Sequence, residues 1–209
     1  MSHSLNISEY YFKGKTDKPY LTLDDDGHEI AKPHPKLLLH TCCAPCSPYV
    51  LRHLKKVFEL NCFFYNPNIH PEEEYEFRYQ ELEKLLEGLE LPLEKGEYEI
   101  AEWMRLNKDL GHLPERDTRC VNCIKLRLER TAQKAVAEDY EYFSTVLSVS
   151  PHKVADMINL LGKELSEKYG VKYLYSDLKK NNGYLQTTRL ARQYDLKRQD
   201  YCGCIFSKQ

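Results

Sequence analysis

The chain has 209 residues, of which 42% are hydrophobic and 30% charged, and its formal net charge is −2. These values are ordinary for a soluble globular protein and exclude a disordered or fibrous one. No apolar run is long enough to span a membrane, and the N-terminus lacks the basic and apolar regions of a signal peptide. We therefore expect a cytoplasmic protein whose eight cysteines stay reduced and serve in metal binding or catalysis.

Residues 1–35 are polar and rich in tyrosine, and two prolines stand near their end. The acidic stretch at residues 24–27 ends in glycine and is typical of a turn. We predict an N-terminal extension or short hairpin over residues 1–35 and a single catalytic α/β domain over residues 36–209.

The regular part of the chain begins with a strand at residues 37–40, a short apolar run typical of burial on both faces of a sheet. A cysteine-rich loop follows, and Ser47 and Pro48 predict the N-cap and first turn of a helix. The unit then recurs. Residues 62–65 form a second strand, residues 66–71 a loop, and Glu72 opens a helix with three glutamates in its first turn.

Apolar spacing predicts further elements along the rest of the chain. They are a strand from residue 91, a helix from near Asn122, a strand at 142–147, a helix opened by Ser150 and Pro151 and ended by Gly170, and a strand at 171–175. This alternation indicates an α/β fold with a doubly wound, mostly parallel sheet. Sites in such sheets lie beyond the carboxyl ends of the strands, where the loops after residues 40 and 65 fall.

Seven of the eight cysteines form three clusters, and Cys62 lies inside an apolar strand, where we expect a buried hydrophobic side chain. The clusters are Cys42, Cys43 and Cys46; Cys120 and Cys123; and Cys202 and Cys204. A pair of thiolates from each of the first two clusters meets the requirement of a structural zinc or of an iron–sulfur cluster. Spacing alone does not separate these two. The thiols left over argue against a closed structural zinc site, which would have no use for them.

Two further functions remain open at this point. The sequence Cys43-Ala-Pro-Cys46 is also typical of a thioredoxin-like thiol–disulfide oxidoreductase. A zinc-stabilised RNA-binding module without catalysis is the other alternative. Cys202 and Cys204 are separated by one glycine, so a disulfide between them closes a small, readily reduced ring. They could pass electrons in this way or add ligands to a second metal.

Charge is unevenly distributed along the chain. Residues 72–102 hold twelve acidic and three basic residues, whereas residues 179–199 hold six basic residues and one acidic. A nucleic-acid partner would therefore dock on the C-terminal third. The basic residues there are Lys179, Lys180, Arg189, Arg192, Lys197 and Arg198. Three further residues, His40, Asp117 and Tyr201, lie beside the cysteine clusters in the sequence. They are weaker candidates for the site.

Five motifs occur in the order "HTCCAPC", "FFYNPNIHPEEEYEFR", "RCVNCIKLRLERTA", "STVLSVSPHK" and "RQDYCGC". This set resembles the cobalamin-independent epoxyqueuosine reductase family, QueH, from about residue 36 to residue 207. The resemblance implies a Rossmann-like fold akin to PP-loop (HUP-like) domains. It also implies the last step of queuosine biosynthesis, in which the epoxide oxygen of epoxyqueuosine is removed at the wobble position of tRNA. The Ser-Gly-Gly-x-Asp-Ser nucleotide motif of PP-loop domains is absent, so we expect no use of ATP.

The resemblance further implies a [4Fe-4S] cluster held by Cys42, Cys43, Cys120 and Cys123, and a redox-active pair of Cys202 and Cys204. Some relatives have aspartate where this chain has Cys46. That exchange suits a ligand to a second, mononuclear iron better than half of a disulfide. We expect a two-electron deoxygenation in which iron polarises the epoxide C–O bond. The sequence does not identify the electron donor or the proton donor.

Overall fold

The computed structural model describes residues 22–23, 29–30, 34–180 and 182–207. A five-stranded sheet in the order β5-β4-β3-β6-β7 forms its centre, and every strand pairs in parallel with its neighbour. The strands are β3 (Lys36–His40), β4 (Glu59–Phe64), β5 (Leu93–Lys95), β6 (Tyr142–Thr145) and β7 (Lys172–Tyr173). The order of strands reverses between β3 and β6. The predicted doubly wound, Rossmann-like α/β fold is confirmed.

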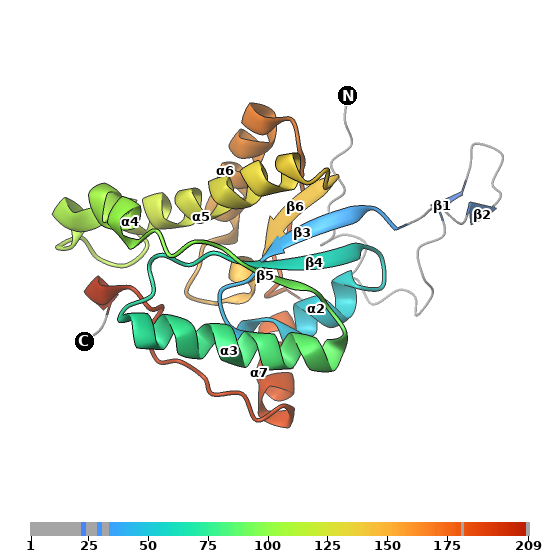
Figure 1. Cartoon of the computed structure of the whole chain (residues 1–209), viewed down its shortest axis with the longest axis horizontal. Helices are drawn as coiled ribbons and strands as arrows, with labels where there is room; N and C mark the ends of the chain where they lie inside the picture. The colour runs from blue at the N-terminus through green and yellow to red at the C-terminus, as the bar shows by residue number, and fades with distance from the viewer. Residues whose placement is uncertain (1–21, 24–28, 31–33, 181, 208–209) are drawn as a thin grey trace.

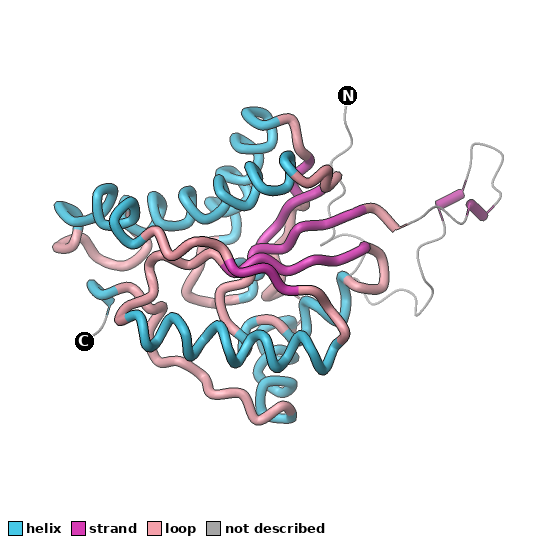
Figure 2. Tube along the Cα trace, in the orientation of Figure 1, coloured by secondary structure: helices cyan, strands magenta, loops and turns pink. Residues whose placement is uncertain are grey.

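Helices cover both faces of this sheet (Figures 1 and 2). The helices are α2 (Pro48–Leu54), α3 (Glu72–Leu89) and α7 (Gly183–Gln193) on one side, α5 (Thr118–Ala137) and α6 (Ala155–Tyr169) on the other, and α4 (Ile100–Asn107) beside α5. Side-chain alternation along β3 explains the two layers. Leu37 and Leu39 pack in the core under α2 and α3, and Leu38 packs with α5 and α6.

Four short 3-10 helices join these elements: η1 (Ala44–Cys46), η2 (Lys108–Leu110), η3 (Val146–Val149) and η4 (Ile205–Ser207). Among the predicted strand boundaries that differ from the structure, one reflects such a turn and another a proline. The strand predicted to reach residue 147 stops at Thr145, where η3 begins. The strand predicted from residue 91 begins at Leu93, because Pro92 has no N–H to donate to the ladder. Neither α4 nor α7 was predicted.

Two helix starts also differ from the prediction, and a third helix starts as predicted but is not capped by its serine hydroxyl. Helix α5 begins at Thr118, one turn before Asn122, because the Asp117 side chain accepts the Thr118 backbone N–H at 2.5 Å. Helix α6 begins at Ala155, because residues 150–153 instead form a turn closed by the Lys153 N–H to Ser150 O bond at 3.2 Å. Ser47 occupies the cap position of α2 as predicted, but its hydroxyl donates to Cys43 O at 2.8 Å instead of capping the helix.

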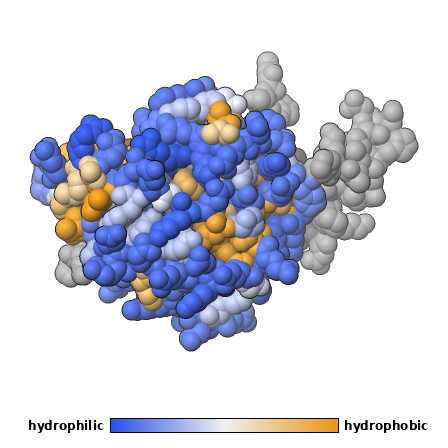
Figure 3. Space-filling model, in the orientation of Figure 1, coloured by the Kyte–Doolittle hydropathy of each residue, from blue (hydrophilic) through white to orange (hydrophobic). Residues whose placement is uncertain are grey.

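The described part of the N-terminal segment holds β1 (Thr22–Leu23) and β2 (Glu29–Ile30), which pair antiparallel in a sheet of their own. This pairing suits the predicted hairpin, whose turn at residues 24–27 lies outside the described residues. The boundary at residue 35 stays a prediction. The surface in Figure 3 is mostly hydrophilic, with apolar side chains gathered in small areas. Among the described helices, none has the length and apolar character to cross a membrane.

Candidate functional site

A cavity of about 300 Å³ lies beyond the carboxyl ends of the strands. Loops after β3, β4 and β6 line it, together with the first turns of α5 and α7 and the C-terminal segment. It therefore sits where the strand order reverses, which is the ligand site of doubly wound folds. Seven of the eight cysteines line it, namely Cys42, Cys43, Cys46, Cys120, Cys123, Cys202 and Cys204. Cys62 is fully buried in β4 outside the cavity, as predicted.

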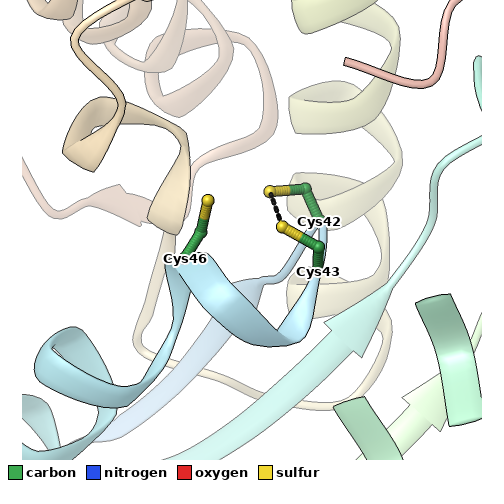
Figure 4. Close-up of side chains that lie close together, drawn as sticks. All are labelled: Cys42, Cys43 and Cys46. Carbon is green, nitrogen blue, oxygen red and sulfur yellow. Dashed lines mark hydrogen bonds between the residues drawn. The ribbon is translucent and has the colours of Figure 1, made fainter. Parts of the chain in front are cut away.

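The first cluster is a compact group of thiols (Figure 4). The sulfur atoms of Cys42, Cys43 and Cys46 all lie within 4.8 Å of one another, and those of Cys42 and Cys43 are 3.6 Å apart. The fold places them here because β3 ends at His40 and η1 immediately turns the chain. Sulfur–metal bonds in proteins measure about 2.3 Å for zinc, so three thiolates at this spacing can reach one metal ion.

One of these three thiols is poised as a thiolate. The thiols of Cys43 and Cys46 donate hydrogen bonds to the Cys42 sulfur, which hold the pKa of Cys42 well below its usual range despite burial. The same bonds, with burial, raise the pKa of Cys43 and of Cys46. A thioredoxin-like pair has its low pKa on the first cysteine of Cys-x-x-Cys. Here that residue is Cys43, whose pKa moves in the opposite direction.

The second cluster lies in the first two turns of α5. Cys120 is half-buried and Cys123 is buried, at 8% exposure. The backbone N–H of Arg116 points to the Cys120 sulfur at 3.3 Å. The positive end of the helix dipole favours thiolates at these positions. Both sulfurs lie outside the 4.8 Å group of the first cluster, although all five thiols share the cavity. Asp117 is the exposed cap of this helix, and the hydrogen bond from Thr118 lowers its pKa.

The third cluster is clamped against the loop that follows β4. The His70 N–H donates to Gly203 O at 2.8 Å, and the Asn68 amide donates to Cys202 O at 3.3 Å. Gly203 has a positive φ of 96°, and a Cβ there would lie 2.8 Å from Ile69 Cγ1. Only glycine tolerates both constraints, so the sequence Cys-Gly-Cys is what allows the chain to fit at this point.

Cys202 and Cys204 differ in protonation. A hydrogen bond from the Cys204 thiol lowers the pKa of Cys202 to about 4, with help from the Lys153 charge and the Ser207 hydroxyl, whose oxygen lies 3.1 Å from the Cys202 sulfur. The same bond and burial raise the pKa of Cys204. The pair thus presents one thiolate and one thiol. This is the arrangement that starts thiol–disulfide exchange, because the thiolate is the nucleophile.

Sequence reasoning missed two buried arginines in the cavity wall. Arg119 is 2% exposed and Arg127 is 4% exposed. Neither is among the site residues predicted from the sequence. The signal was present, since Arg119, Cys123 and Arg127 recur every fourth residue along α5. The same row continues into Thr131 and Ala135, both fully buried.

His40, a weaker sequence candidate, is a buried structural residue beneath the cavity. Its Nδ1 lies 2.8 Å from Thr145 Oγ1 and its Nε2 lies 3.1 Å from Tyr65 O. Because a carbonyl only accepts, Nε2 carries the proton and Nδ1 accepts from the threonine hydroxyl. Burial lowers the pKa of His40 to about 4. The neutral ring therefore joins the ends of β3, β4 and β6.

We expect His40 to make the protein sensitive to acid. Its pKa of about 4 in the folded chain lies below an unfolded value of about 6.5. The contribution of neutral His40 to the free energy of unfolding is therefore complete above the pKa of the unfolded chain. It is lost as the pH falls through the pKa of the folded chain, which lowers the free energy of unfolding by up to about 3 kcal/mol. Urea unfolding of wild type and His40→Gln between about pH 7 and pH 4 measures this. The free energy of unfolding of the variant should fall less steeply with decreasing pH than that of the wild type. Equal dependence on pH in both proteins would contradict the assignment.

The predicted nucleic-acid residues do not share one environment. Arg198 lines the cavity, and its guanidinium donates to the Tyr184 hydroxyl at 2.7 Å. Lys179 and Lys180 form ion pairs with Asp177 at 2.8 and 3.9 Å. Arg189 and Arg192 are exposed on α7 and do not line the cavity. Tyr201 lines the cavity, but its hydroxyl donates to His70 O at 2.7 Å.

The donor set fits a thiolate-bound metal centre. Thiols from three separate segments of the chain reach one cavity, and thiolates are the ligands of both zinc and iron–sulfur sites. The guanidiniums of Arg119 and Arg127 form no ion pair with a carboxylate of the described residues, so an anionic group in this cavity would match their charge. Fold and site together define a Rossmann-like α/β protein with a thiol-lined, metal-competent cavity.

Comparison with known proteins narrows this class to one family. The family model described as "Epoxyqueuosine reductase QueH" matches residues 37–209. The chain is 41% identical over 181 residues to an epoxyqueuosine reductase QueH of Staphylococcus epidermidis, with 83% of this chain and 76% of that protein covered. It is 41% identical over 174 residues to the Thermotoga maritima protein of the same name, with 82% and 89% covered. The chain therefore belongs to the QueH family.

Proposed function

We propose that this chain is an epoxyqueuosine reductase, an oxidoreductase that removes the epoxide oxygen of epoxyqueuosine at the wobble position of tRNA. The observation that carries the proposal is the convergence of seven thiols from three segments on one cavity, in a chain whose relatives are named for this reaction. A tRNA substrate implies a cytoplasmic enzyme.

We assign a [4Fe-4S] cluster to Cys42, Cys43, Cys120 and Cys123. All four thiols line one cavity, and the helix dipole at Cys120 and Cys123 favours the thiolate form that binds metal, which supports this set. Cys46 or Cys204 remains for a second, mononuclear iron, and the proximity of Cys46 to Cys42 and Cys43 favours Cys46, which leaves Cys204 to pair with Cys202. The iron, when bound, supplies single electrons and a Lewis acid for the epoxide oxygen.

The Cys202–Cys204 pair supplies the number of electrons that the reaction needs. Conversion of an epoxide to an alkene and water consumes two electrons and two protons. Oxidation of one thiolate and one thiol to a disulfide releases two electrons and one proton, so the second proton comes from another acid. The Cys202 thiolate and the Cys204 thiol stand in the cavity wall, where the pair can accept electrons from an external donor of unidentified nature and pass them on.

The cavity suits one extruded nucleotide rather than a duplex. Enzymes that modify a base take it out of the stack and read its edges in a pocket. Tyr184 and Arg198 lie in the wall, and a half-buried tyrosine ring beside a guanidinium can stack on a base. The basic residues Lys179, Lys180, Arg189, Arg192 and Arg198 would contact the anticodon-stem phosphates.

We expect the double variant Arg189→Gln/Arg192→Gln to bind tRNA about tenfold more weakly and to reduce the slope of log affinity against log salt by about 2. Both guanidiniums are exposed on α7, so the cluster should be retained. Arg105→Gln is the control, because Arg105 on α4 is paired with Glu102 at 2.8 Å. Filter binding across a salt series measures the slopes. An unchanged slope in the double variant refutes this docking surface.

Anaerobic turnover tests the function directly. Cluster-reconstituted protein, a chemical reductant and tRNA containing epoxyqueuosine should yield queuosine, seen by nucleoside mass spectrometry as the loss of one oxygen. No mass change with a cluster-loaded sample overturns the proposal. Stoichiometric zinc in colourless protein would instead favour the RNA-binding module. The raised pKa of Cys43 argues against the thioredoxin-like alternative, and a metal-free protein that reduces disulfides would revive it.

A further inference from the structure

Two permanently charged side chains are buried beside the thiols without a carboxylate to balance them. Arg119 and Arg127 are 2% and 4% exposed. Among the described residues, the ion pairs include neither of them, whereas the third buried arginine of the cavity, Arg78, pairs with Glu74 at 2.7 Å. A buried unpaired charge costs several kcal/mol even after relaxation. Something anionic must therefore compensate these two guanidiniums.

The contacts of Arg119 hold its charge at the wall of the thiol cavity. Its Nη1 donates to the Cys204 sulfur at 3.4 Å, and its Nη2 donates to Leu113 O at 3.2 Å. Its Nε is buried and has no hydrogen-bond partner in the described chain. The ring of Phe206 lies 5.3 Å from the guanidinium carbon and closes that side to water. The fixed charge is thus held in a dry position against the thiol cavity.

Arg127 lies about two turns further along the same helix, in the same cavity wall. Its Nε donates to Cys123 O at 3.1 Å, and its Nη1 lies 3.5 Å from Asn66 Oδ1. Arg127 also lines the same cavity as Cys42, Cys43 and Cys46. The two arginines therefore place positive charge beside all three cysteine clusters, from one stripe of α5.

We infer that Arg119 and Arg127 compensate the negative charge of the metal–thiolate centre and raise its reduction potential. The inference rests on the cluster assigned under the proposed function. Net charge and hydrogen bonds to sulfur are what set such potentials. An added electron makes the centre more negative, and a buried positive charge stabilises that state more than the oxidised one. Exposed charges act through water and have much smaller effects.

The test is the midpoint potential of the anaerobic, cluster-loaded protein, followed by electron paramagnetic resonance during a redox titration. Arg119→Gln should shift the redox equilibrium at least tenfold toward the oxidised form, which is about 59 mV for a one-electron couple. Arg119→Lys retains the positive charge and should return the midpoint potential most of the way to the wild-type value. Arg198→Gln removes an exposed arginine of the same cavity and should shift the equilibrium less than threefold.

Arg127→Gln is the second variant, for the case in which Arg119→Gln does not retain its cluster. The inference is overturned if the midpoint potentials of both glutamine variants differ from wild type by no more than that of Arg198→Gln does. The proposed function would not be affected by that result. A wild-type protein that holds no iron–sulfur cluster, by iron and sulfide analysis, overturns the proposed function and this inference together. A lowered potential in either glutamine variant with rescue by lysine supports it.

Discussion

Cys120→Ser is expected to lose the cluster iron and more than ~100-fold of the reductase activity, because loss of even a supporting partner of a metal ligand costs 10- to 100-fold. Cys43→Ser should behave alike, although Cys43 lies on a different element. The two thiols come from the loop before η1 and from α5, and they share one wall only in the folded cavity. Iron and sulfide content per chain, and anaerobic turnover of epoxyqueuosine tRNA, are the measurements.

Cys62→Ala is the matched control for these variants. This thiol is fully buried in β4 and does not line the cavity, so its loss should cost about 1 kcal/mol of stability and no iron. Cys46→Ser tests which thiols hold the cluster and which hold the second iron. We expect it to keep the cluster iron and lose the second iron. The reverse result, with full iron in Cys120→Ser and cluster loss in Cys46→Ser, would move the cluster to the compact group of Figure 4.

The fold was predictable because its signals are local. Buried parallel strands are short apolar runs, and the run at residues 37–40 is the central strand β3. The errors fell where a single hydrogen bond decides a boundary. Asp117 starts α5 one turn early, and the turn closed by Lys153 delays α6. Helix α7 was missed because only Gly183, Thr187 and Ala191 are its buried residues, which gives no apolar stripe to read.

The candidate site was predictable in its residue types and less so in its arrangement. The number and spacing of the cysteines identified them as site residues. The three clusters followed from spacing, but the close approach of the Cys46 sulfur to those of Cys42 and Cys43 did not, since it depends on the turn made by η1. Arg119 and Arg127 were missed although they lie in the buried row of α5, because an arginine in a helix is usually solvent-exposed. The C-terminal pair reaches the cavity through long-range hydrogen bonds to the loop after β4, which carry no sequence signature.

Cys202→Ser is expected to reduce turnover at least ~100-fold with a thiol reductant while the iron content stays at the wild-type value, because the attacking form of the pair is its thiolate. The pKa of Cys202 is lowered to about 4, so that thiolate is already formed at neutral pH. Its alkylation by iodoacetamide in the apo protein should then be nearly independent of pH between about pH 6 and pH 8, whereas an ordinary cysteine with a pKa of about 8.5 reacts faster as the pH rises.

The choice of reductant decides what the pair does. If Cys202 and Cys204 relay electrons, a low-potential reductant that reduces the cluster directly should bypass them and return activity to Cys202→Ser. If they are metal ligands, no reductant restores activity and iron per chain falls. Cys204→Ser should match Cys202→Ser in the first case, because a disulfide needs both sulfurs. Ser207→Ala removes only the hydroxyl 3.1 Å from the Cys202 sulfur and should have a much smaller effect. A variant pair with normal turnover on a thiol reductant would exclude the relay, and the two electrons would then have to enter the cavity by another route.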